Sequence, residues 1–545
     1  PFRPKPLEFL LAPEARETET PSARERESAA MDSDQRCCCP PAEAATGSPS
    51  ARVQVLTGHA TASPGTRDEH SGPQTVGGGF PSPMSAMRSA PREELLYIPA
   101  VMNHGLEGGD RPDYLATVDV DPCSATYAQV IHRLLMPEPG DELHHMGWNS
   151  CSSCYGKPGV STHAYLVAPG VISGNVYFID VKSEPRVPRF HKTIRAEELA
   201  EKAGVGLPHT AHCAPQEIIM SFMGGPREEG VFPRDGVGFV SIDPKTLEVN
   251  GRWERGEVRP RFGYDFWYQP RHNVMISSEW GEPMCFLSGF DPTKVAEGSY
   301  GQKIYVWDWA AHKIVHELDM GQGSIPLEVR FLHDPAAAEG YVGCALSSEM
   351  VRFFRQEEGT WDSEVAVKIP PIPVEGWALP EMPALITDFV LSLDDRFMYV
   401  ACWLHGDVRQ YDITDRRHPR LVGQAFIGGS LKRGGPVRRT DGAEQPAPLV
   451  VKGVEVQGGA QMVQLSLDGT RLYVSTSLFS SWDRQFYPEL ASKGAQLLQL
   501  DADTERGGLA VNHDFLVDFG QEPFGPALCH EMRLPGGDCT SDIWL

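Results

Sequence analysis

Histidine and cysteine side chains crowd into residues 141–154, a short polar run that reads DELHHMGWNSCSSC. The run holds two adjacent histidines, His144 and His145, and a Cys-x-x-Cys formed by Cys151 and Cys154. Imidazole is a ligand for copper, zinc, iron and nickel, whereas thiolates prefer soft metals. The run therefore predicts metal chemistry, through its histidines, its cysteines or both.

More histidines follow at nearly regular intervals. From His145 the steps are roughly 60 to 70 residues long, and a last step of about twice that length reaches His530, as in a structural repeat with one histidine missing near residues 461–468. Equivalent positions in a ring of repeats converge on a central channel, so we expect at least three of these histidines to share a metal. The alternative is that each histidine caps a turn or satisfies a buried polar group. The candidates are His144 or His145, His209 or His212, His272, His333, His405 and His530.

Several acids lie near these histidines in the sequence and could orient them or transfer protons. Histidines that bind a metal usually donate their other N–H to a carboxylate or a carbonyl. For any single acid, the alternative is a turn cap or a solvated side chain. We take Glu531 and Asp538 as the catalytic candidates, and the other members of the group are Asp265, Glu279, Glu328, Asp388 and Asp407.

Three roles stay open for Cys151 and Cys154: holding a soft metal or metalloid, cycling through a disulfide, or serving as ordinary loop thiols. A structural zinc site needs a second close pair of ligands, which residues 91–545 do not supply. A thioredoxin-like role needs a βαβ context, which the surrounding pattern does not predict. The other cysteines, Cys213 among them, are expected to be small core residues.

The composition is that of an acidic globular protein. The 545 residues carry a formal net charge of -24 at pH 7, which repels phosphate backbones and argues against a nucleic-acid partner. The sequence has no run of about 18 apolar residues, so it predicts no transmembrane segment. It also has no secretory signal pattern. The 12 cysteines show no disulfide-scaffold spacing, so we expect reduced thiols and a cytoplasmic location, with the nucleus as a second compartment.

Residues 1–90 and 91–545 differ in composition. The first segment is rich in Pro, Ser, Ala, Glu and Arg and has almost no aromatic residues, so we expect a disordered tail. Met31 is its first methionine, and the residues before it could be upstream sequence that precedes the true start. Residues 91–545 have the patterning of a folded domain.

A strand–turn–strand unit recurs seven times in this domain. Each unit alternates apolar and polar residues, passes through a turn rich in Asp, Pro or Gly, and continues as a second strand, which is typical of a β-hairpin. The unit at Arg352 fits least well because its acidic residue is displaced. The seven units begin at Val118, Tyr177, Val240, Tyr305, Arg352, Arg409 and Leu498.

Two near-copies, LSLDDRFMYV from Leu391 and LSLDGTRLYV from Leu465, precede some of the hairpins and raise the expected number to about four strands per unit. Seven such units predict an all-β fold, a seven-bladed β-propeller over residues 91–545. The final DIWL, residues 542–545, is suited to pairing with the first strand and closing the ring. Two stacked β-sandwich domains are the alternative, but they do not explain a period that runs through the whole domain.

Longer motifs resemble those of the selenium-binding protein family. The resemblance covers roughly residues 91–545, and matches of this length are highly specific. The motifs are DELHHMGWNSCSSC, YLATVDVD, GYDFWYQPRHNVMISSEW, PLEVRFLHDP, ITDFVLSLDDRFMYVACWLHGDVRQYDI and PGGDCTSDIWL.

The resemblance implies a seven-bladed propeller with methanethiol oxidase activity, which converts methanethiol, O2 and water to formaldehyde, hydrogen sulfide and hydrogen peroxide. It also implies a copper cofactor, since bacterial members are copper-dependent, and selenium or cadmium binding through cysteines. Animal members carry a cysteine where this chain has Ala128, which shifts attention for selenium or soft-metal binding to Cys151 and Cys154. The implied copper ligands correspond to His144, His145, His209, His212, His333, His405 and His530.

Three functions compete on these grounds. The histidines favour an oxidase that acts on a small thiol with O2, and this is the function that we expect. The Cys-x-x-Cys favours a non-catalytic binder that sequesters selenium or heavy metals through thiols. A propeller can also serve as an interaction scaffold, which would be indifferent to loss of the histidines. The sequence identifies no protein partner.

Overall fold

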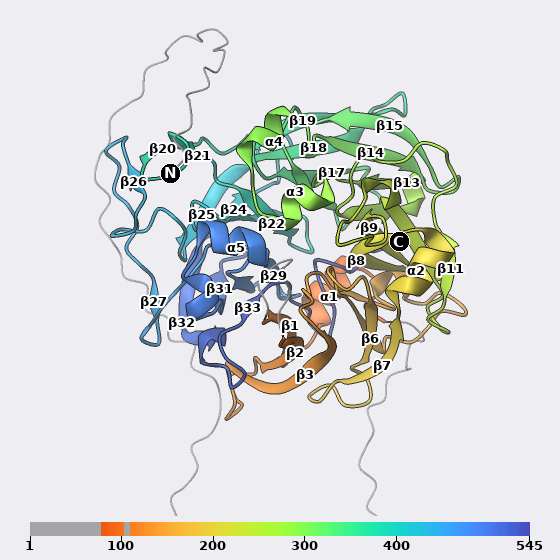
Figure 1. Cartoon of the computed structure of the whole chain (residues 1–545), viewed down its shortest axis with the longest axis horizontal. Helices are drawn as coiled ribbons and strands as arrows, with labels where there is room; N and C mark the ends of the chain where they lie inside the picture. Colours follow the sequence, from red (N-terminus) through yellow and green to blue (C-terminus); the bar gives the residue numbers. More distant parts are fainter. Residues whose placement is uncertain (1–77, 103–109) are drawn as a thin grey trace, which may run out of the picture. The chain divides into compact units, whose positions relative to one another are not determined.

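Antiparallel strands are the main regular secondary structure of the computed structural model, which describes residues 78–102 and 110–545. Within these residues the chain forms seven four-stranded antiparallel sheets, which follow one another around a ring (Figure 1). The fold is therefore the all-β propeller that the repeats predict. No helix in the described residues is long and apolar enough to cross a bilayer. The expectations for residues 1–77, including the one for Met31, lie outside the described part of the chain.

Each sheet runs from a buried innermost strand to a partly exposed outermost strand. Strands are given from innermost to outermost. The first sheet consists of β33 (Leu528–Cys529), β1 (Leu95–Val101), β2 (Pro112–Asp119) and β3 (Gln129–Pro139). The second consists of β4 (Gly147–Trp148), β5 (Tyr165–Pro169), β6 (Val176–Asp180) and β7 (Arg189–Ile194). The third sheet consists of β8 (Gly206–Ala214), β9 (Glu217–Gly224), β10 (Gly238–Ile242) and β11 (Val249–Arg252). The fourth consists of β12 (Phe266–Gln269), β13 (Val274–Ser277), β14 (Lys303–Asp308) and β15 (Lys313–Asp319).

The last three sheets continue this order. They are β16 (Pro326–Phe331), β17 (Glu339–Cys344), β18 (Glu349–Arg355) and β19 (Trp361–Lys368); β22 (Ile386–Leu391), β23 (Phe397–Cys402), β24 (Asp407–Asp412) and β25 (Arg420–Phe426); and β29 (Val463–Leu465), β30 (Arg471–Ser475), β31 (Gln496–Ala502) and β32 (Leu509–Asp518). Short extra strands are β20 (Ile372–Glu375), β21 (Glu381–Met382), β26 (Arg438–Arg439), β27 (Val450–Val451) and β28 (Val454–Glu455).

Short helices lie in the connections. The α-helices are α1 (Pro83–Ser89), α2 (Ala196–Ala203), α3 (Pro283–Leu287), α4 (Pro292–Ala296), α5 (Ser480–Phe486) and α6 (Leu490–Lys493). Single turns of 3-10 helix are η1 (Ser152–Cys154), η2 (Arg234–Gly236), η3 (Pro270–His272) and η4 (Phe519–Gln521).

All seven predicted hairpins join the third and outermost strands of a sheet. The acidic residue that marks the repeat accepts hydrogen bonds from backbone N–H groups of the turn. Asp180 accepts them from Lys182 and Ser183, each at 3.0 Å, and Asp243 accepts them from Lys245 and Thr246, each at 2.8 Å. Asp favours such turns because its side chain replaces a backbone acceptor. The repeat is visible in the sequence because these turns require that residue.

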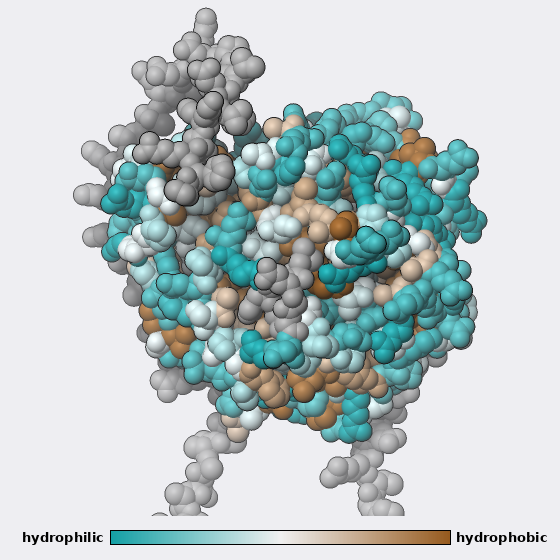
Figure 2. Space-filling view, in the orientation of Figure 1, coloured by the Kyte–Doolittle hydropathy of each residue, from teal (hydrophilic) through white to brown (hydrophobic). Residues whose placement is uncertain are grey.

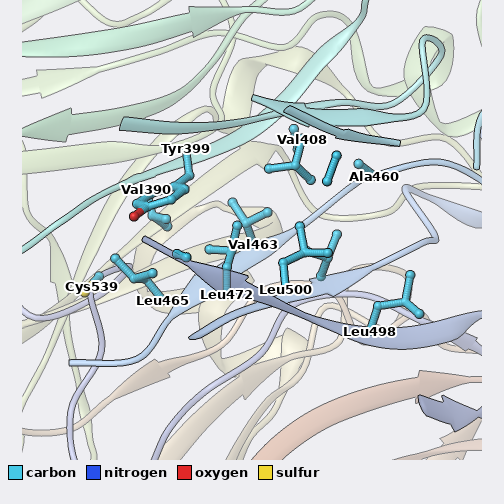
Figure 3. Close-up of a cluster of buried hydrophobic side chains, with 14 of the residues drawn as sticks. Val390, Tyr399, Val408, Ala460, Val463, Leu465, Leu472, Leu498, Leu500 and Cys539 are labelled. Carbon is cyan, nitrogen blue, oxygen red and sulfur yellow. The ribbon is translucent and has the colours of Figure 1, made fainter. Parts of the chain in front are cut away.

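Apolar side chains fill the space between neighbouring sheets. Figure 3 shows one such layer, where Val390 and Val408 of one sheet meet Val463, Leu472 and Leu500 of the next. All five are fully buried or nearly so. Burying a side chain of this size contributes about 1.5–3 kcal/mol, so these layers hold the ring of sheets together.

One face of the molecule is mostly hydrophilic. The face shown in Figure 2 has predominantly hydrophilic residues and only small hydrophobic areas. Phe190 on β7, Val315 on β15 and Leu421 on β25 are among the exposed large apolar residues, and all three lie on outermost strands.

The expectation of a disordered tail is wrong for residues 78–90. Helix α1 begins after Ser82, whose side chain accepts a hydrogen bond from Ser85, and it has a proline at its first position. The backbone N–H of Phe80 donates to Ser152 Oγ at 3.2 Å, and Ala86 is buried against two of the sheets. A short helix that is ordered by such long-range contacts leaves little signal in composition.

The ring also closes differently from our expectation. The strand beside β1 is β33, with Ala100 opposite Cys529, and residues 542–545 form no strand. Instead residues 542–544 are buried and Leu545 is partly buried: the Trp544 carbonyl accepts a hydrogen bond from Gln269 at 3.1 Å, and the Trp544 ring lies 5.3 Å from that of His333. The apolar character of DIWL reflects burial beside β12 and β16 rather than pairing with the first strand.

Glu93 joins the segment before β1 to strand β30. Its carboxylate accepts hydrogen bonds from Arg471 Nε at 2.6 Å, Arg471 Nη2 at 2.8 Å and the Tyr473 hydroxyl at 2.8 Å. Glu93→Ala removes the acceptor of Arg471 Nε and of the Tyr473 hydroxyl in a largely buried place, while Arg471 Nη2 keeps Asp468, so we expect a loss of about 2 kcal/mol in unfolding free energy and a lower thermal midpoint. Glu489→Ala, which removes an exposed helical pair with Lys493, should leave the midpoint unchanged. Equal midpoints for the two variants would refute this role of Glu93.

Candidate metal centre

Four histidines from three sheets come together in the ring. His144 and His145 precede β4, His209 lies on β8, and His530 follows β33. These strands are the innermost of their sheets, and in a propeller such strands surround the central channel. The ring centroid of His145 lies 4.1 Å from that of His209, and that of His144 lies 3.7 Å from that of His530. We call these four residues the histidine cluster.

The cluster offers nitrogen atoms suited to a metal. One ring nitrogen from each of His144, His145 and His209 lies within 4.8 Å of the others. The Nε2 atoms of all four histidines are buried without a hydrogen-bond partner. By contrast, Nδ1 of His209 lies 2.9 Å from Thr210 Oγ1, and Nδ1 of His530 lies 3.0 Å from the Ser477 carbonyl oxygen. An imidazole that binds a metal typically has one ring nitrogen hydrogen-bonded to the protein and the other without a hydrogen-bond partner, as here.

Burial keeps these imidazoles neutral. Desolvation lowers the pKa of His530 to about 3, and it lowers the pKa of His144, His145 and His209 well below the usual value. The neighbouring histidines lower the pKa values of His144, His145 and His209 further, because each would repel a second positive charge. A neutral imidazole has a free lone pair, which metal binding requires.

Bulges in innermost strands introduce several of the polar residues around the channel. The register of β8 shifts between Pro208 and Ala211, which brackets His209. Similar shifts in β16 and β22 bracket Glu328 and Asp388. A β-bulge adds one unpaired residue and re-aims a side chain, so polar residues can enter the channel without breaking the sheet.

Two carboxylates flank the His145 ring. Glu531 Oε1 lies 3.6 Å from Nδ1, and Glu328 Oε1 lies 3.7 Å from Nε2. Glu531 also accepts a hydrogen bond from the backbone N–H of Met146 and pairs with Arg533 at 2.6 Å. Burial raises the pKa of Glu531 to about 7, although Arg533 opposes the rise. Glu531 can therefore hold or release a proton near neutral pH.

Buried arginines balance the acids around the cluster. Arg330 Nη2 lies 3.2 Å from both Glu328 and Asp388, and its Nη1 lies 3.6 Å from Asp265. Desolvation raises the pKa of all three carboxyls, and Arg330 opposes the rise. These acids and Glu531 outnumber Arg330 and Arg533, so a bound cation would be stabilised here.

An aromatic wall borders the cluster. The His209 ring lies 4.2 Å from that of Tyr264. The His144 ring lies 5.3 Å from that of Phe479, edge to face, and 6.5 Å from that of Trp280, nearly parallel. All three aromatic residues are buried, so water is excluded from this side of the histidines.

His212 lies on the same strand as His209 but outside the cluster. Its Nδ1 lies 3.4 Å from the Ser541 carbonyl oxygen, and its Nε2 lies 4.0 Å from Asp265 Oδ1. It therefore faces the C-terminal segment and the acids rather than the bare nitrogens of the cluster.

The structure does not bring three other histidines of the predicted series to the cluster. His333 follows the end of β16, and its Nε2 lies 3.1 Å from the Leu391 carbonyl oxygen. His405 lies between β23 and β24, and its Nε2 lies 3.1 Å from the Met382 carbonyl oxygen. His272 follows the end of β12. These histidines recur with the period of the sheets but occupy other positions within them.

Asp538 holds the C-terminal segment in place. It accepts hydrogen bonds from Gln464 Nε2 at 2.6 Å, from the Leu534 backbone at 2.8 Å and from the Trp148 indole. Its nearest arginine is Arg533, whose Nε lies 4.0 Å away. None of its hydrogen bonds within residues 78–102 and 110–545 reaches the cluster, in contrast to Glu531, which lies beside His145.

Three cysteine thiols, which could also bind a metal, surround Ser153. Its hydroxyl oxygen lies 3.3 Å from Cys151 Sγ, 3.7 Å from Cys154 Sγ and 3.5 Å from Cys213 Sγ. All three thiols are buried and free. A hydrogen bond from Cys213 lowers the pKa of Cys154 to about 6, whereas burial raises the pKa of Cys213.

Sequence reasoning missed Cys213 as a member of this thiol group. Its only signal is its position directly after His212 on β8, since the spacing between Cys154 and Cys213 matches no local ligand motif. Ala128, where the resemblance places a cysteine in animal members, is buried in an apolar cluster and supplies no ligand atom.

The fold and the site together define a β-propeller with a buried, histidine-rich candidate metal centre. The family model for 56kDa selenium binding protein (SBP56) matches residues 74–545. The chain belongs to this family, which confirms the resemblance seen in its motifs.

Relatives and a solved structure agree with this assignment. The chain is 56% identical over 473 residues to a bovine protein named methanethiol oxidase and 54% identical over 473 residues to a mouse protein named selenium-binding protein 2, covering 86% of this chain and 98% of each relative. The X-ray structure of a hypothetical selenium-binding protein from Sulfolobus tokodaii is 35% identical, with a TM-score of 0.74, and the match covers 86% of this chain and 98% of that one.

Removing one member of the cluster should weaken metal binding. We expect His209→Ala to raise the Kd for Cu2+ by at least about 10-fold, because a buried ligand is lost. His333→Ala should leave the Kd unchanged, since its Nε2 already faces a carbonyl oxygen. Isothermal titration of the metal-free protein measures both values. The opposite ranking of the two variants would place the metal elsewhere.

Proposed function

We propose that this chain is a methanethiol oxidase and that the histidine cluster is its catalytic metal centre. The reaction converts methanethiol, O2 and water to formaldehyde, hydrogen sulfide and hydrogen peroxide. The observation that carries the proposal is the set of four buried, neutral imidazoles with bare Nε2 atoms. Relatives of more than half identity, matched over nearly their whole length, that are named methanethiol oxidase support the same activity.

Copper is the metal that we propose for the cluster, held by His144, His145, His209 and His530. Imidazoles bind Cu2+ well, and neutral nitrogen donors without competing hydrogen bonds fit it. When bound, copper acidifies a thiol and exchanges single electrons with oxygen, which side chains cannot easily do. The substrates are accordingly a small thiol and O2.

The protein's own groups supply proton transfer and positioning. Glu531 lies beside His145, and its raised pKa suits it to accept the substrate's thiol proton. Arg533 and the Met146 backbone hold the Glu531 carboxylate in place. We assign Asp538 a positioning role, because it acts on the cluster through Arg533. The aromatic wall keeps water from the histidines and gives the substrate methyl group an apolar surface.

Oxygen uptake by the copper-loaded protein on addition of methanethiol is the direct test. We expect uptake to be matched by hydrogen sulfide release, and to be lost in His209→Ala but kept in His405→Ala, whose imidazole lies outside the cluster. A protein that holds its copper and consumes no oxygen with methanethiol would contradict the proposal.

Glu531→Gln should separate proton transfer from metal binding. The amide keeps the shape of the carboxyl group but cannot accept a proton, so we expect kcat to fall by about 100-fold or more while the copper content stays the same. Glu279→Gln removes a buried carboxylate that bonds Tyr305 rather than the cluster, and it should retain kcat. An unchanged kcat in Glu531→Gln would remove this residue from the mechanism.

The second candidate function is non-catalytic binding of selenium or heavy metals through Cys151, Cys154 and Cys213. The convergence of three buried thiols on Ser153 favours it, as does the mouse relative named selenium-binding protein 2.

We place the protein in the cytoplasm, where such thiols stay reduced.

A Cys151→Ser, Cys154→Ser, Cys213→Ser variant distinguishes the two functions. We expect it to lose tight Cd2+ binding, because soft metals prefer thiolates, and to keep oxygen uptake with methanethiol. Loss of both properties would mean that the thiols serve the oxidase. Retention of tight Cd2+ binding would place the soft-metal site elsewhere.

A further inference from the structure

We propose that Phe479 sets the upper size of the thiol that the histidine cluster accepts. This inference rests on the proposed function, because it takes the cluster as the place where the substrate sulfur binds. The Phe479 ring meets that of His144 edge to face at 5.3 Å and 84°, and it meets that of Trp280 at 5.8 Å and 90°. Phe479 is therefore the member of the aromatic wall that contacts both His144, a candidate ligand, and Trp280.

The backbone around Phe479 is fixed on both sides. The next residue, Ser480, donates its backbone N–H to Glu142 at 2.8 Å and its hydroxyl to the same carboxylate. Ser477, two residues earlier, offers its carbonyl oxygen to Nδ1 of His530 at 3.0 Å. The chain beside Phe479 is thus tied to the segment that carries His144 and to His530. Phe479 cannot withdraw from the cluster without breaking buried hydrogen bonds.

Further contacts hold the same turn. Asp483, within α5, accepts hydrogen bonds from the Ser477 hydroxyl at 2.6 Å and from the Leu478 backbone at 3.0 Å. The position of Phe479 is therefore set by the start of α5 as a unit. A rigid apolar wall discriminates by size better than a mobile one, because it cannot relax to admit a larger group.

Solvent reaches the other side of helix α5. Arg484 and Gln485 line one surface hollow, and Gln485, Phe486 and Tyr487 line another. Phe479 itself is 1% exposed. Phe479 directly precedes α5 and lies buried against His144, whereas Arg484 and Gln485 near the other end of α5 are open to solvent. The alkyl group of a thiol bound at the cluster would meet the Phe479 ring.

Size discrimination follows from this placement. A substrate methyl group is small enough to lie against the ring, whereas each further methylene requires space that Phe479 occupies. Apolar pockets discriminate between homologues that differ by one methylene by about 10- to 200-fold. We therefore assign the preference for a one-carbon thiol to Phe479, with Trp280 as the second face of the wall.

Equilibrium binding without oxygen tests the inference apart from turnover. Copper-loaded wild type, Phe479→Ala and Phe479→Leu are titrated with methanethiol and with ethanethiol by calorimetry. We expect the Kd ratio of ethanethiol to methanethiol to fall by about 10-fold in Phe479→Ala and by less in Phe479→Leu, which leaves a smaller space. The same shift should appear in the ratio of kcat/KM values.

Phe515→Ala is the matched control. Phe515 is equally buried, but it packs against Tyr127 and Tyr473, away from the cluster. This variant should lose stability without changing either ratio. If only Phe479→Leu folds, a smaller fall in the ratio than expected for alanine still supports the inference.

The outcomes separate this inference from the oxidase proposal. Unchanged Kd ratios in folded Phe479 variants would overturn the inference, even if the wild type consumes oxygen with methanethiol. A lowered ratio would support it, even if no variant consumes oxygen, in which case the proposed activity alone fails. Wild-type protein that binds neither thiol would overturn the inference as well.

Discussion

Desolvation of ionisable groups in the channel is the constraint on which the site depends. Arg330 contacts Asp265, Glu328 and Asp388, and Arg533 contacts Glu531, all of them buried. Buried charges are costly unless they are paired and hydrogen-bonded, so the acids can stay near the histidines only because the arginines accompany them. Burial lowers the pKa of each histidine of the cluster, so these imidazoles stay neutral. Burial thus gives one channel both neutral imidazoles with bare Nε2 atoms and a carboxyl group that can hold a proton.

The hairpins could be predicted from the sequence because each depends on local rules. Alternation of apolar residues sets the strands, and an aspartate caps most of the turns, as Asp180 and Asp243 do. These signals repeat, so the propeller follows from them. The partner of β1 could not be predicted, because Leu528–Cys529 and residues 542–545 are both apolar, and only three-dimensional packing decides which of them pairs.

The spacing of the histidines predicts the period of the sheets, but it does not predict where in each sheet a histidine lies. His209 and His333 are both near an innermost strand, one within it and one after its end, and this difference separates a cluster member from a histidine bonded to a carbonyl. Residues close together in the chain also diverge, since His209 and His212 lie on one strand yet only His209 joins the cluster. Cys213 shows the opposite case, since it is distant in sequence from Cys151 and Cys154 yet lies beside them in the structure. Contacts between neighbouring sheets leave no pattern in sequence spacing.

Ring closure by β33 has a consequence for how the centre is assembled. His144 and His145 come from the second sheet of the ring, whereas His530 and Glu531 directly follow the strand that completes the first. A ribosome-bound chain that has folded its early sheets still lacks these late residues, so the complete set of ligands exists only after synthesis has passed them. A metal that contacts all four histidines could therefore bind only after His530 has been made and β33 has closed the ring.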